Sequence, residues 1–146
     1  MSSSRRRLLV AVDFDGTIVT ENYPAIGEEI PGALGTIQAL QKNGHKVFLY
    51  TMRGHPRNQE QRDILQEAID WLESRGVVMD GINRSPEQFS TSLKQFANVY
   101  IDDRNFGAPS RYWNGLEVFD WQEVATWFLR IEAITPSDFI GIFKNF

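Results

Sequence analysis

The sequence has no cysteine among its 146 residues. That absence excludes disulfide bonds, thiol catalysis and zinc sites built from thiolates. Histidine is scarce as well, and the two copies, His45 and His55, lack the spacing of a metal-binding pair. Positive charge is not in excess, because 15 Lys and Arg stand against 19 Asp and Glu. We therefore expect neither general binding to nucleic acid nor attraction to an acidic membrane surface.

Long apolar runs are also missing. The run Leu8–Val12 is far shorter than the ~20 residues that a membrane helix needs, and two acids follow it closely. It is likewise too short for the core of a signal peptide. We therefore expect a cytoplasmic protein without a membrane segment. The length and the 42% hydrophobic content predict one domain over residues 1–146.

Strand-like and helix-like patterns alternate along the chain. Apolar runs typical of buried strands lie at 8–12, 46–50, 77–79, 99–101 and, more weakly, 116–118. Helical patterns fill the intervals between them, at about 31–43, 58–75, 86–96 and from 120 onward. Strands separated in this way predict parallel strands with right-handed crossovers and helices on both sheet faces. The expected fold is α/β, a three-layer Rossmann-like domain with a mainly parallel sheet.

The most informative motif, Asp13-Phe14-Asp15-Gly16-Thr17, directly follows the first predicted strand. Ligands of such folds bind beyond the carboxyl ends of the strands. Two carboxylates this close repel each other unless a proton or a cation lies between them, and Mg²⁺ prefers hard oxygen ligands. One carboxylate can then serve as a nucleophile and the other as an acid or base. For the motif alone, a strand-end turn is the alternative interpretation, because Asp and Gly are common in turns.

Polar residues follow two further strands in an ordered way. Thr51 directly follows the run 46–50, and at this strand end its hydroxyl can hold an oxygen of a transferred phosphoryl group. Asp102 and Asp103 end the run 99–101, and adjacent acids there are costly unless a cation or donors offset them. Lys94 precedes this pair closely enough to reach the same cleft and neutralise charge. Taken singly, Thr51 could be structural and Lys94 could be an ordinary surface lysine.

The order Asp-x-Asp-Gly-Thr, then Thr, then Lys, then Asp-Asp closely resembles the haloacid dehalogenase superfamily of phosphotransferases. This resemblance implies that Asp13 is the nucleophile and forms an aspartyl-phosphate. It implies that Asp15 protonates the leaving oxygen and later activates water. Thr51 and Lys94 would hold the phosphoryl oxygens and complete the catalytic set. Phosphoryl transfer depends mainly on positioning and charge neutralisation, which such residues can supply.

The resemblance also implies a metal site and a substrate site. Asp102 would bind Mg²⁺ together with Asp13 and the main-chain carbonyl of Asp15, and Asp103 would assist directly or through water. The predicted substrate contacts come from the strand ends and the residues that follow them: Gly16, Thr17, Arg53 and Arg104. The expected partner is a phosphorylated substrate, small or large.

Neither interval between the motifs is long enough for a folded cap domain. Between Asp13 and Thr51 there is room only for a flap at 21–27 and one helix. The chain therefore resembles the capless branch, whose open sites accept bulky substrates or are closed by a second subunit. The apolar tail 139–146 could cover the sheet or form a contact between subunits, so a homo-oligomer is one of two alternatives. We expect a Mg²⁺-dependent phosphomonoester hydrolase. The alternatives are another phosphoryl-transfer reaction at the same aspartate and a non-catalytic protein that binds phosphate and metal.

Overall fold

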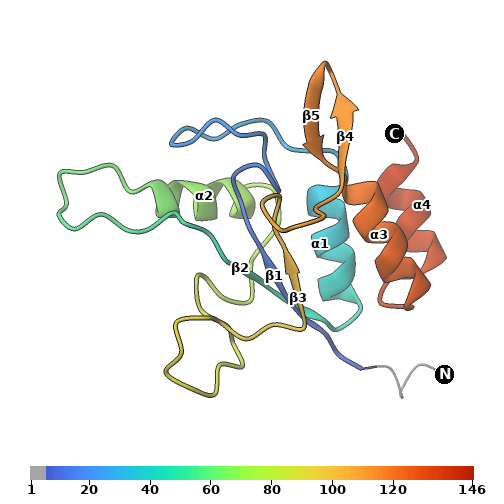
Figure 1. The fold of residues 1–146 in the computed structure, drawn as a ribbon, viewed down its shortest axis with the longest axis horizontal. Helices are drawn as coiled ribbons and strands as arrows, with labels where there is room; N and C mark the ends of the chain where they lie inside the picture. The colour runs from blue at the N-terminus through green and yellow to red at the C-terminus, as the bar shows by residue number, and fades with distance from the viewer. Residues whose placement is uncertain (1–5) are drawn as a thin grey trace.

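The computed structural model describes residues 6–146, and three parallel strands run through its centre (Figure 1). They are β1 (Leu9–Val12), β2 (Lys46–Leu49) and β3 (Val99–Ile101), in the order β2-β1-β3. All four residues of the central strand β1 are buried. A parallel strand covered on both faces needs an uninterrupted apolar run, which explains its sequence. The α/β class and the parallel sheet are therefore as predicted.

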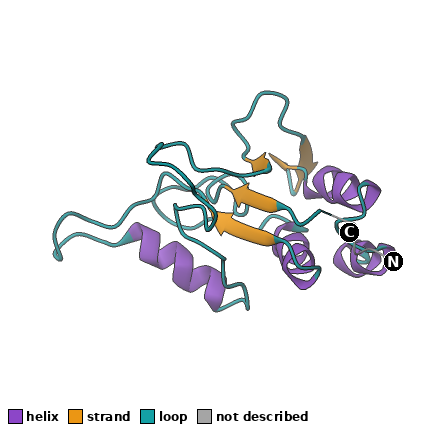
Figure 2. Cartoon of the chain, turned by 90° about the horizontal axis from the view of Figure 1, so that it is seen from below, coloured by secondary structure: helices purple, strands orange, loops and turns teal. Residues whose placement is uncertain are grey.

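The described residues also form four helices: α1 (Ala33–Lys42), α2 (Ile64–Glu73), α3 (Trp121–Arg130) and α4 (Pro136–Phe143). In Figure 2, α2 lies at one end of the molecule, while α3 and α4 lie together at the other. The apolar tail contributes to α4, whose Phe143 is buried. Among residues 6–146, none of the helices combines the length and the apolar character that crossing a membrane requires.

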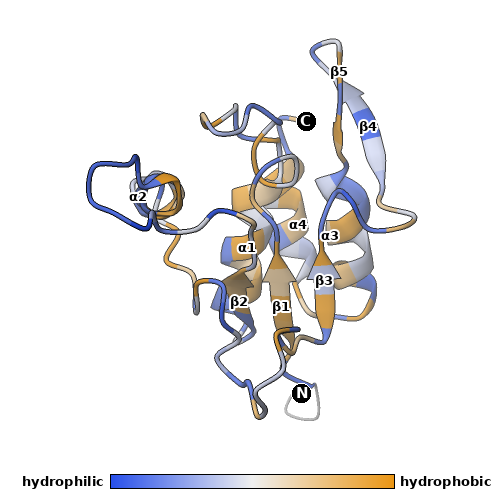
Figure 3. Ribbon diagram, turned by 60° about the vertical axis from the view of Figure 1, so that its left-hand side comes forward, coloured by the Kyte–Doolittle hydropathy of each residue, from blue (hydrophilic) through white to orange (hydrophobic). Residues whose placement is uncertain are grey.

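Side chains at the helix starts explain where two of the helices begin. Asp63 accepts a hydrogen bond from the Gln66 amide at 2.9 Å, so α2 starts after the strongly hydrophilic segment 53–62 and not at 58 as predicted (Figure 3). Asp120 accepts from the amide of Glu123 at 3.1 Å, which confirms the predicted start of α3. Such caps satisfy amide groups that have no partner inside the helix.

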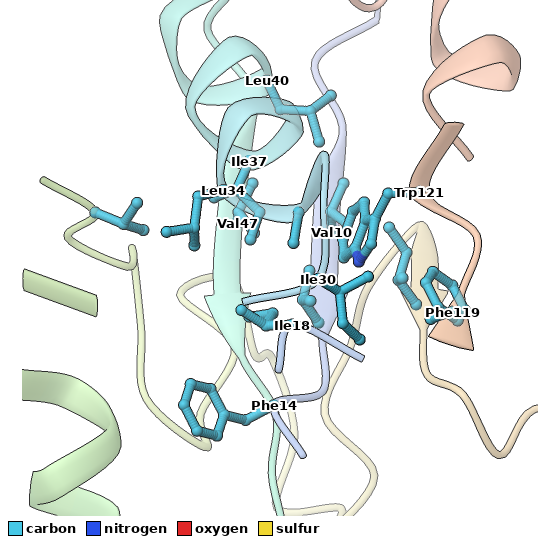
Figure 4. Packing of buried hydrophobic residues seen from close by; sticks show 14 of the residues in the cluster. Val10, Phe14, Ile18, Ile30, Leu34, Ile37, Leu40, Val47, Phe119 and Trp121 are labelled. Carbon is cyan, nitrogen blue, oxygen red and sulfur yellow. The ribbon is translucent and has the colours of Figure 1, made fainter. Parts of the chain in front are cut away.

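The main core lies between one face of the sheet and the helices. Val10 and Val47 meet Ile37 of α1 and Trp121 of α3 within this cluster (Figure 4). The other face carries Leu9, Ala11 and Phe48, and the cluster on it contains no residue of the four helices. The residues that pack against this face are instead partly buried and come from loops and from β3: Tyr50, Phe96, Ala97 and Tyr100.

Two predicted elements are absent from the structure. The run 77–79 forms no strand, although Ile82 makes an isolated parallel bridge to Leu49 just beyond it. The segment 86–96 is irregular and not helical. Its serines explain this, because the hydroxyls of Ser90 and Ser92 accept from amides two residues further on, at 3.2 Å in both cases. Such local bonds compete with the hydrogen bonds of a helix.

The predicted strand 116–118 exists, but its partner is a neighbour in the sequence. β4 (Ser110–Trp113) and β5 (Leu116–Phe119) form an antiparallel hairpin separate from the parallel sheet. The turn between them is Asn114-Gly115, and both residues have positive φ, at 51° and 80°. This is the conformation that favours two-residue hairpin turns, so the local turn determines how the strand pairs.

Candidate functional site

Three acidic side chains meet where β1 and β3 end. One carboxylate oxygen each from Asp13, Asp102 and Asp103 lies within 4.8 Å of the other two. The parallel pairing of β1 with β3 brings the three side chains together. The pairing extends one residue beyond β1, because the amide of Asp13 donates a hydrogen bond to the carbonyl of Ile101 at 2.9 Å. Three hard oxygen donors at this spacing suit a divalent cation such as Mg²⁺. The structure thus brings together three of the four residues predicted to bind metal.

The electrostatics of the cluster also fit a cation. Burial, together with the negative charge of Asp102, raises the pKa of Asp13 to about 7. Burial likewise raises the pKa of Asp103, and the charge of Asp102 adds to this effect. Without a cation the cluster therefore retains a proton near neutral pH, whereas a bound dication would supply the missing positive charge.

Thr17 contacts two of the carboxylates through its hydroxyl. Its side chain is fully buried, and its hydroxyl lies 3.2 Å from Asp13 Oδ2 and 3.1 Å from Asp103 Oδ1. The same hydroxyl accepts from the Asp103 amide at 2.9 Å. The sequence predicts a substrate contact here, but the buried hydroxyl is occupied by the two aspartates. Thr17 therefore orients Asp13 and Asp103.

Gly16 allows the chain to pass directly beside Asp103. Its φ is +82°, and a Cβ atom at this position would lie 2.5 Å from Asp103 Oδ2. Its amide is already bound to the carbonyl of Val19 at 2.7 Å. Gly16 therefore has a steric role, since only glycine fits both the backbone angle and the space. Its predicted contact with substrate stays a prediction, and Gly16 borders a cleft of about 470 Å³ together with Asp103.

Asp15 does not join the acidic cluster. Its two carboxylate oxygens accept from Arg53 Nε at 2.8 Å and Nη2 at 2.7 Å. The Asp15 side chain is 12% exposed, while that of Arg53 is fully buried. The predicted acid or base is therefore held in a bidentate ion pair, which fixes its orientation strongly. It still borders the cleft that Asp13 lines.

Arg53 also binds two more segments. It donates to the carbonyl of Ala25 at 3.0 Å and to the carbonyl of Ile64 at 2.9 Å, at the start of α2. Its guanidinium lies 5.2 Å from the Phe14 ring centroid and 5.5 Å from that of Tyr23. The sequence predicts that Arg53 contacts substrate, but its burial and its protein partners leave it no free face. It ties the flap and α2 to Asp15.

Thr51 lies where β2 ends and borders the same cleft as Asp13 and Asp15. Its amide donates to Asn83 Oδ1 at 2.8 Å, and Asn83 Nδ2 donates to the carbonyl of Arg53 at 2.9 Å. Asn83 thereby fixes the loop that carries Thr51 and Arg53. Sequence reasoning missed Asn83, which lies four positions after the apolar run 77–79 and has a left-handed φ of 54°.

Lys94 reaches the site from the irregular segment before β3. It lines a cleft of about 440 Å³ that Asp13 and Asp102 also border. Its Nζ lies 5.6 Å from the centroid of the Tyr100 ring, and the side chain is otherwise exposed. Lys94 therefore borders the same cleft as two of the acids, although the helix predicted to carry it is absent.

A second cleft, of about 320 Å³, is bordered by the same two aspartates. Besides Asp13 and Asp102, it is bordered by Tyr23, Met52 and Arg104. Tyr23 belongs to the flap and is 52% exposed, while Met52 is 90% exposed. Of the four predicted substrate contacts, Arg104 is the one whose side chain is open to a ligand in this cleft.

Comparison with known proteins gives one informative match. No family model matches the chain, and no curated protein does either. The solved structure of a conserved protein from Bacteroides thetaiotaomicron is similar, with a TM-score of 0.66 and 36% sequence identity. The match covers 91% of this chain and 97% of that protein. At this identity and coverage, the chain belongs to the same family as the conserved Bacteroides protein.

Proposed function

We propose that the protein is a Mg²⁺-dependent phosphomonoester hydrolase of the haloacid dehalogenase superfamily, acting through an aspartyl-phosphate on Asp13. The observation that carries this proposal is the convergence of Asp13, Asp102 and Asp103 at the ends of two adjacent parallel strands. Thr51 borders one cleft that Asp13 lines, and Lys94 borders another. The order of these groups along the chain and their meeting in space support the same chemistry.

The finer fold assignment belongs to the same proposal. The strand order β2-β1-β3 supports a Rossmann-like domain of three layers, in which the segment around Phe96 and Ala97 serves as the third layer. The flap at 21–27 is the only segment between the first two motifs that could cover the site from above, which supports the capless branch. We include in this proposal a phosphorylated substrate and, as expected from the sequence, a cytoplasmic location.

In the first step, an oxygen of Asp13 attacks the phosphorus. The bond between phosphorus and the leaving oxygen breaks, and its electron pair stays on that oxygen. Asp15, protonated at this stage, gives its proton to the same oxygen, so that an alcohol leaves and Asp15 becomes a carboxylate. Lys94 and the hydroxyl of Thr51 would hold the non-bridging oxygens, because each borders a cleft shared with Asp13. Mg²⁺ held by Asp13, Asp102 and Asp103 would neutralise the phosphoryl charge.

In the second step, water attacks the phosphorus of the aspartyl-phosphate. The carboxylate of Asp15 accepts the proton of that water, and the bond from phosphorus to the Asp13 oxygen breaks. The buried ion pair with Arg53 suits this step, since it holds Asp15 in one orientation beside the cleft. Phosphate then leaves, and Asp13 is regenerated.

One observation favours a second candidate function, a non-catalytic protein that binds metal and phosphate. Both oxygens of Asp15 already accept from Arg53, so a proton that Asp15 would give to a leaving oxygen must compete with the guanidinium. Binding of metal and phosphate at Asp13, Asp102 and Lys94 does not need that proton. Another phosphoryl-transfer reaction at Asp13 remains an alternative of the same chemistry.

Release of phosphate from an aryl phosphate, with and without Mg²⁺, tests these functions. We expect Mg²⁺-dependent release by the wild type and a loss of at least ~10³-fold for Asp13→Asn, about 4 kcal/mol of barrier. Asp70→Asn is the matched control, because Asp70 is an exposed acid on α2. Calorimetric binding of Mg²⁺ and phosphate without any turnover would favour the non-catalytic function.

A further inference from the structure

The cationic side chains around the two clefts differ in how far they are already engaged. Arg53 is buried and makes four hydrogen bonds to protein oxygens. Lys94 lies in the 440 Å³ cleft beside Tyr100. In the 320 Å³ cleft, the exposed cation is Arg104, whose side chain is 77% exposed. An anionic group that enters this cleft therefore meets Arg104.

The backbone of Arg104 is fixed close to the acidic cluster. Its amide donates to Asp102 Oδ1 at 2.9 Å, so the residue keeps a constant position relative to that carboxylate. Its guanidinium faces Glu21 of the flap, with 4.0 Å between Nη2 and Oε1. Because the side chains are 77% and 52% exposed, this pair contributes little, and a ligand anion can displace the Glu21 carboxylate.

We propose that Arg104 binds a second anionic group of the substrate. The substrate class is then a small phosphomonoester whose leaving group carries a carboxylate or another phosphate. A guanidinium binds either anion through two parallel hydrogen bonds, which a hydroxyl group cannot reproduce. Tyr23 and Met52 line the same cleft and provide apolar contact for the carbon skeleton between the two anions. This inference rests on the proposed function.

Glu21 gives the proposal a second, opposite consequence. Its carboxylate occupies the position that the substrate anion would take and repels that anion as well. Glu21→Gln keeps the size of the side chain but removes its negative charge, and with it the repulsion and the attraction that holds this side chain near Arg104. It should therefore strengthen selection for the anionic substrate, whereas Arg104→Met should weaken it.

Two probes with matched skeletons, 3-phosphoglycerate and glycerol 3-phosphate, test the proposal. They differ in that the first carries a carboxylate where the second carries a hydroxymethyl group. Calorimetry with Mg²⁺ in the Asp13→Asn background measures the ratio of their affinities without turnover. We expect 3-phosphoglycerate to bind about tenfold more tightly, as one charge-assisted interaction implies. Arg104→Met should abolish this preference, Glu21→Gln should increase it, and Arg130→Met on α3 should not change it.

Equal affinity for the two probes, binding of neither, or a preference that survives Arg104→Met overturns the inference. Phosphate release by the wild type from both probes is measured in parallel. Release without any preference overturns the role of Arg104 while supporting the hydrolase. A preference in binding without release from any phosphate ester supports the role of Arg104 and refutes the hydrolase.

Discussion

Asp15 and Arg53 form a bidentate ion pair at 2.8 and 2.7 Å, although 38 positions separate them in the sequence. The guanidinium is fully buried and also binds the flap at Ala25 and the start of α2 at Ile64. A buried cation can persist only with such partners, so this pair joins the site to two elements that surround it.

Arg53→Met should therefore destabilise the protein strongly. It leaves the Asp15 carboxylate without its partner in a largely buried position, and loss of one partner of a buried pair costs about 3–5 kcal/mol. Urea unfolding measures the change. The double variant Asp15→Asn/Arg53→Met should regain part of the loss, because the amide carries no charge. A single variant as stable as the wild type would contradict the structural role of the pair.

Mg²⁺ should raise the melting temperature, and Asp102→Ala should remove most of this effect. Asp70→Ala is the matched control. The effect should grow as the pH rises through 7, since the raised pKa of Asp13 means that a proton competes with the metal below that pH. Differential scanning fluorimetry at pH 6 and pH 8 measures it. Equal Mg²⁺ stabilisation of the wild type and Asp102→Ala would count against this metal site.

The metal-free protein should show the opposite pH dependence at Asp13. Its pKa is raised in the folded state from 3.8 to about 7, so between these values the folded state binds more protons than the unfolded chain. Protonation of Asp13 therefore contributes to the free energy of unfolding at low pH, and this contribution is lost as the pH rises from about 4 to 7. Asp13→Asn removes the titration, and its free energy of unfolding should accordingly depend less on pH across this range.

The convergence of the acids could be predicted from sequence because it depends on a general rule. Carboxyl ends of adjacent parallel strands meet at one edge of a sheet, so apolar runs ending in Asp13 and Asp102 are sufficient. The partner of Asp15 could not be predicted in this way. Arg53 lies on an irregular loop, and the direction of its side chain depends on Asn83 and on the packing of the flap.

Two differences between the prediction and the structure have a common physical cause. Residue patterns predict a helix over 86–96, which is absent, and a strand over 116–118, which is present but pairs within a hairpin, and local hydrogen bonds decide both outcomes. Serine hydroxyls cap amides in the first, and the Asn114-Gly115 turn pairs the second with β4. Lys94 borders the same cleft as Asp13 and Asp102 all the same, because the short stretch between it and β3 limits where it can lie.

His45 should make stability fall in mild acid. Its Nδ1 accepts from the Leu8 amide at 3.0 Å, and its Nε2 lies 3.0 Å from the carbonyl of Ala133, which fits a neutral ring. Burial lowers its pKa below 6.5. Below pH 6.5 the unfolded chain therefore binds more protons than the folded protein, and stability decreases as the pH falls toward the folded pKa.

Urea unfolding between pH 5 and pH 7.5 measures this dependence. His45→Gln lacks the titrating ring, so its stability should change less with pH than that of the wild type. The comparison is best made in the Asp13→Asn background, because titration of Asp13 changes the free energy of unfolding in the opposite direction over this pH range. The same slope for His45→Gln and its parent would show that His45 does not cause the acid sensitivity.

Gly16→Ala should impair metal binding as well as folding. The substitution places a Cβ atom 2.5 Å from Asp103 Oδ2 and therefore displaces a carboxylate of the cluster.

Gly115→Ala is the matched control, because Gly115 has nearly the same φ, +80°, and no atom within 4 Å of the added Cβ. Both variants should lose about 1–2 kcal/mol of stability through the left-handed backbone. Only Gly16→Ala should also lose Mg²⁺ affinity, by about tenfold or more, because a displaced ligand costs at least ~1.4 kcal/mol. Calorimetric titration of Mg²⁺ distinguishes the two, and equal affinity in both variants would show that Asp103 is not part of the metal site.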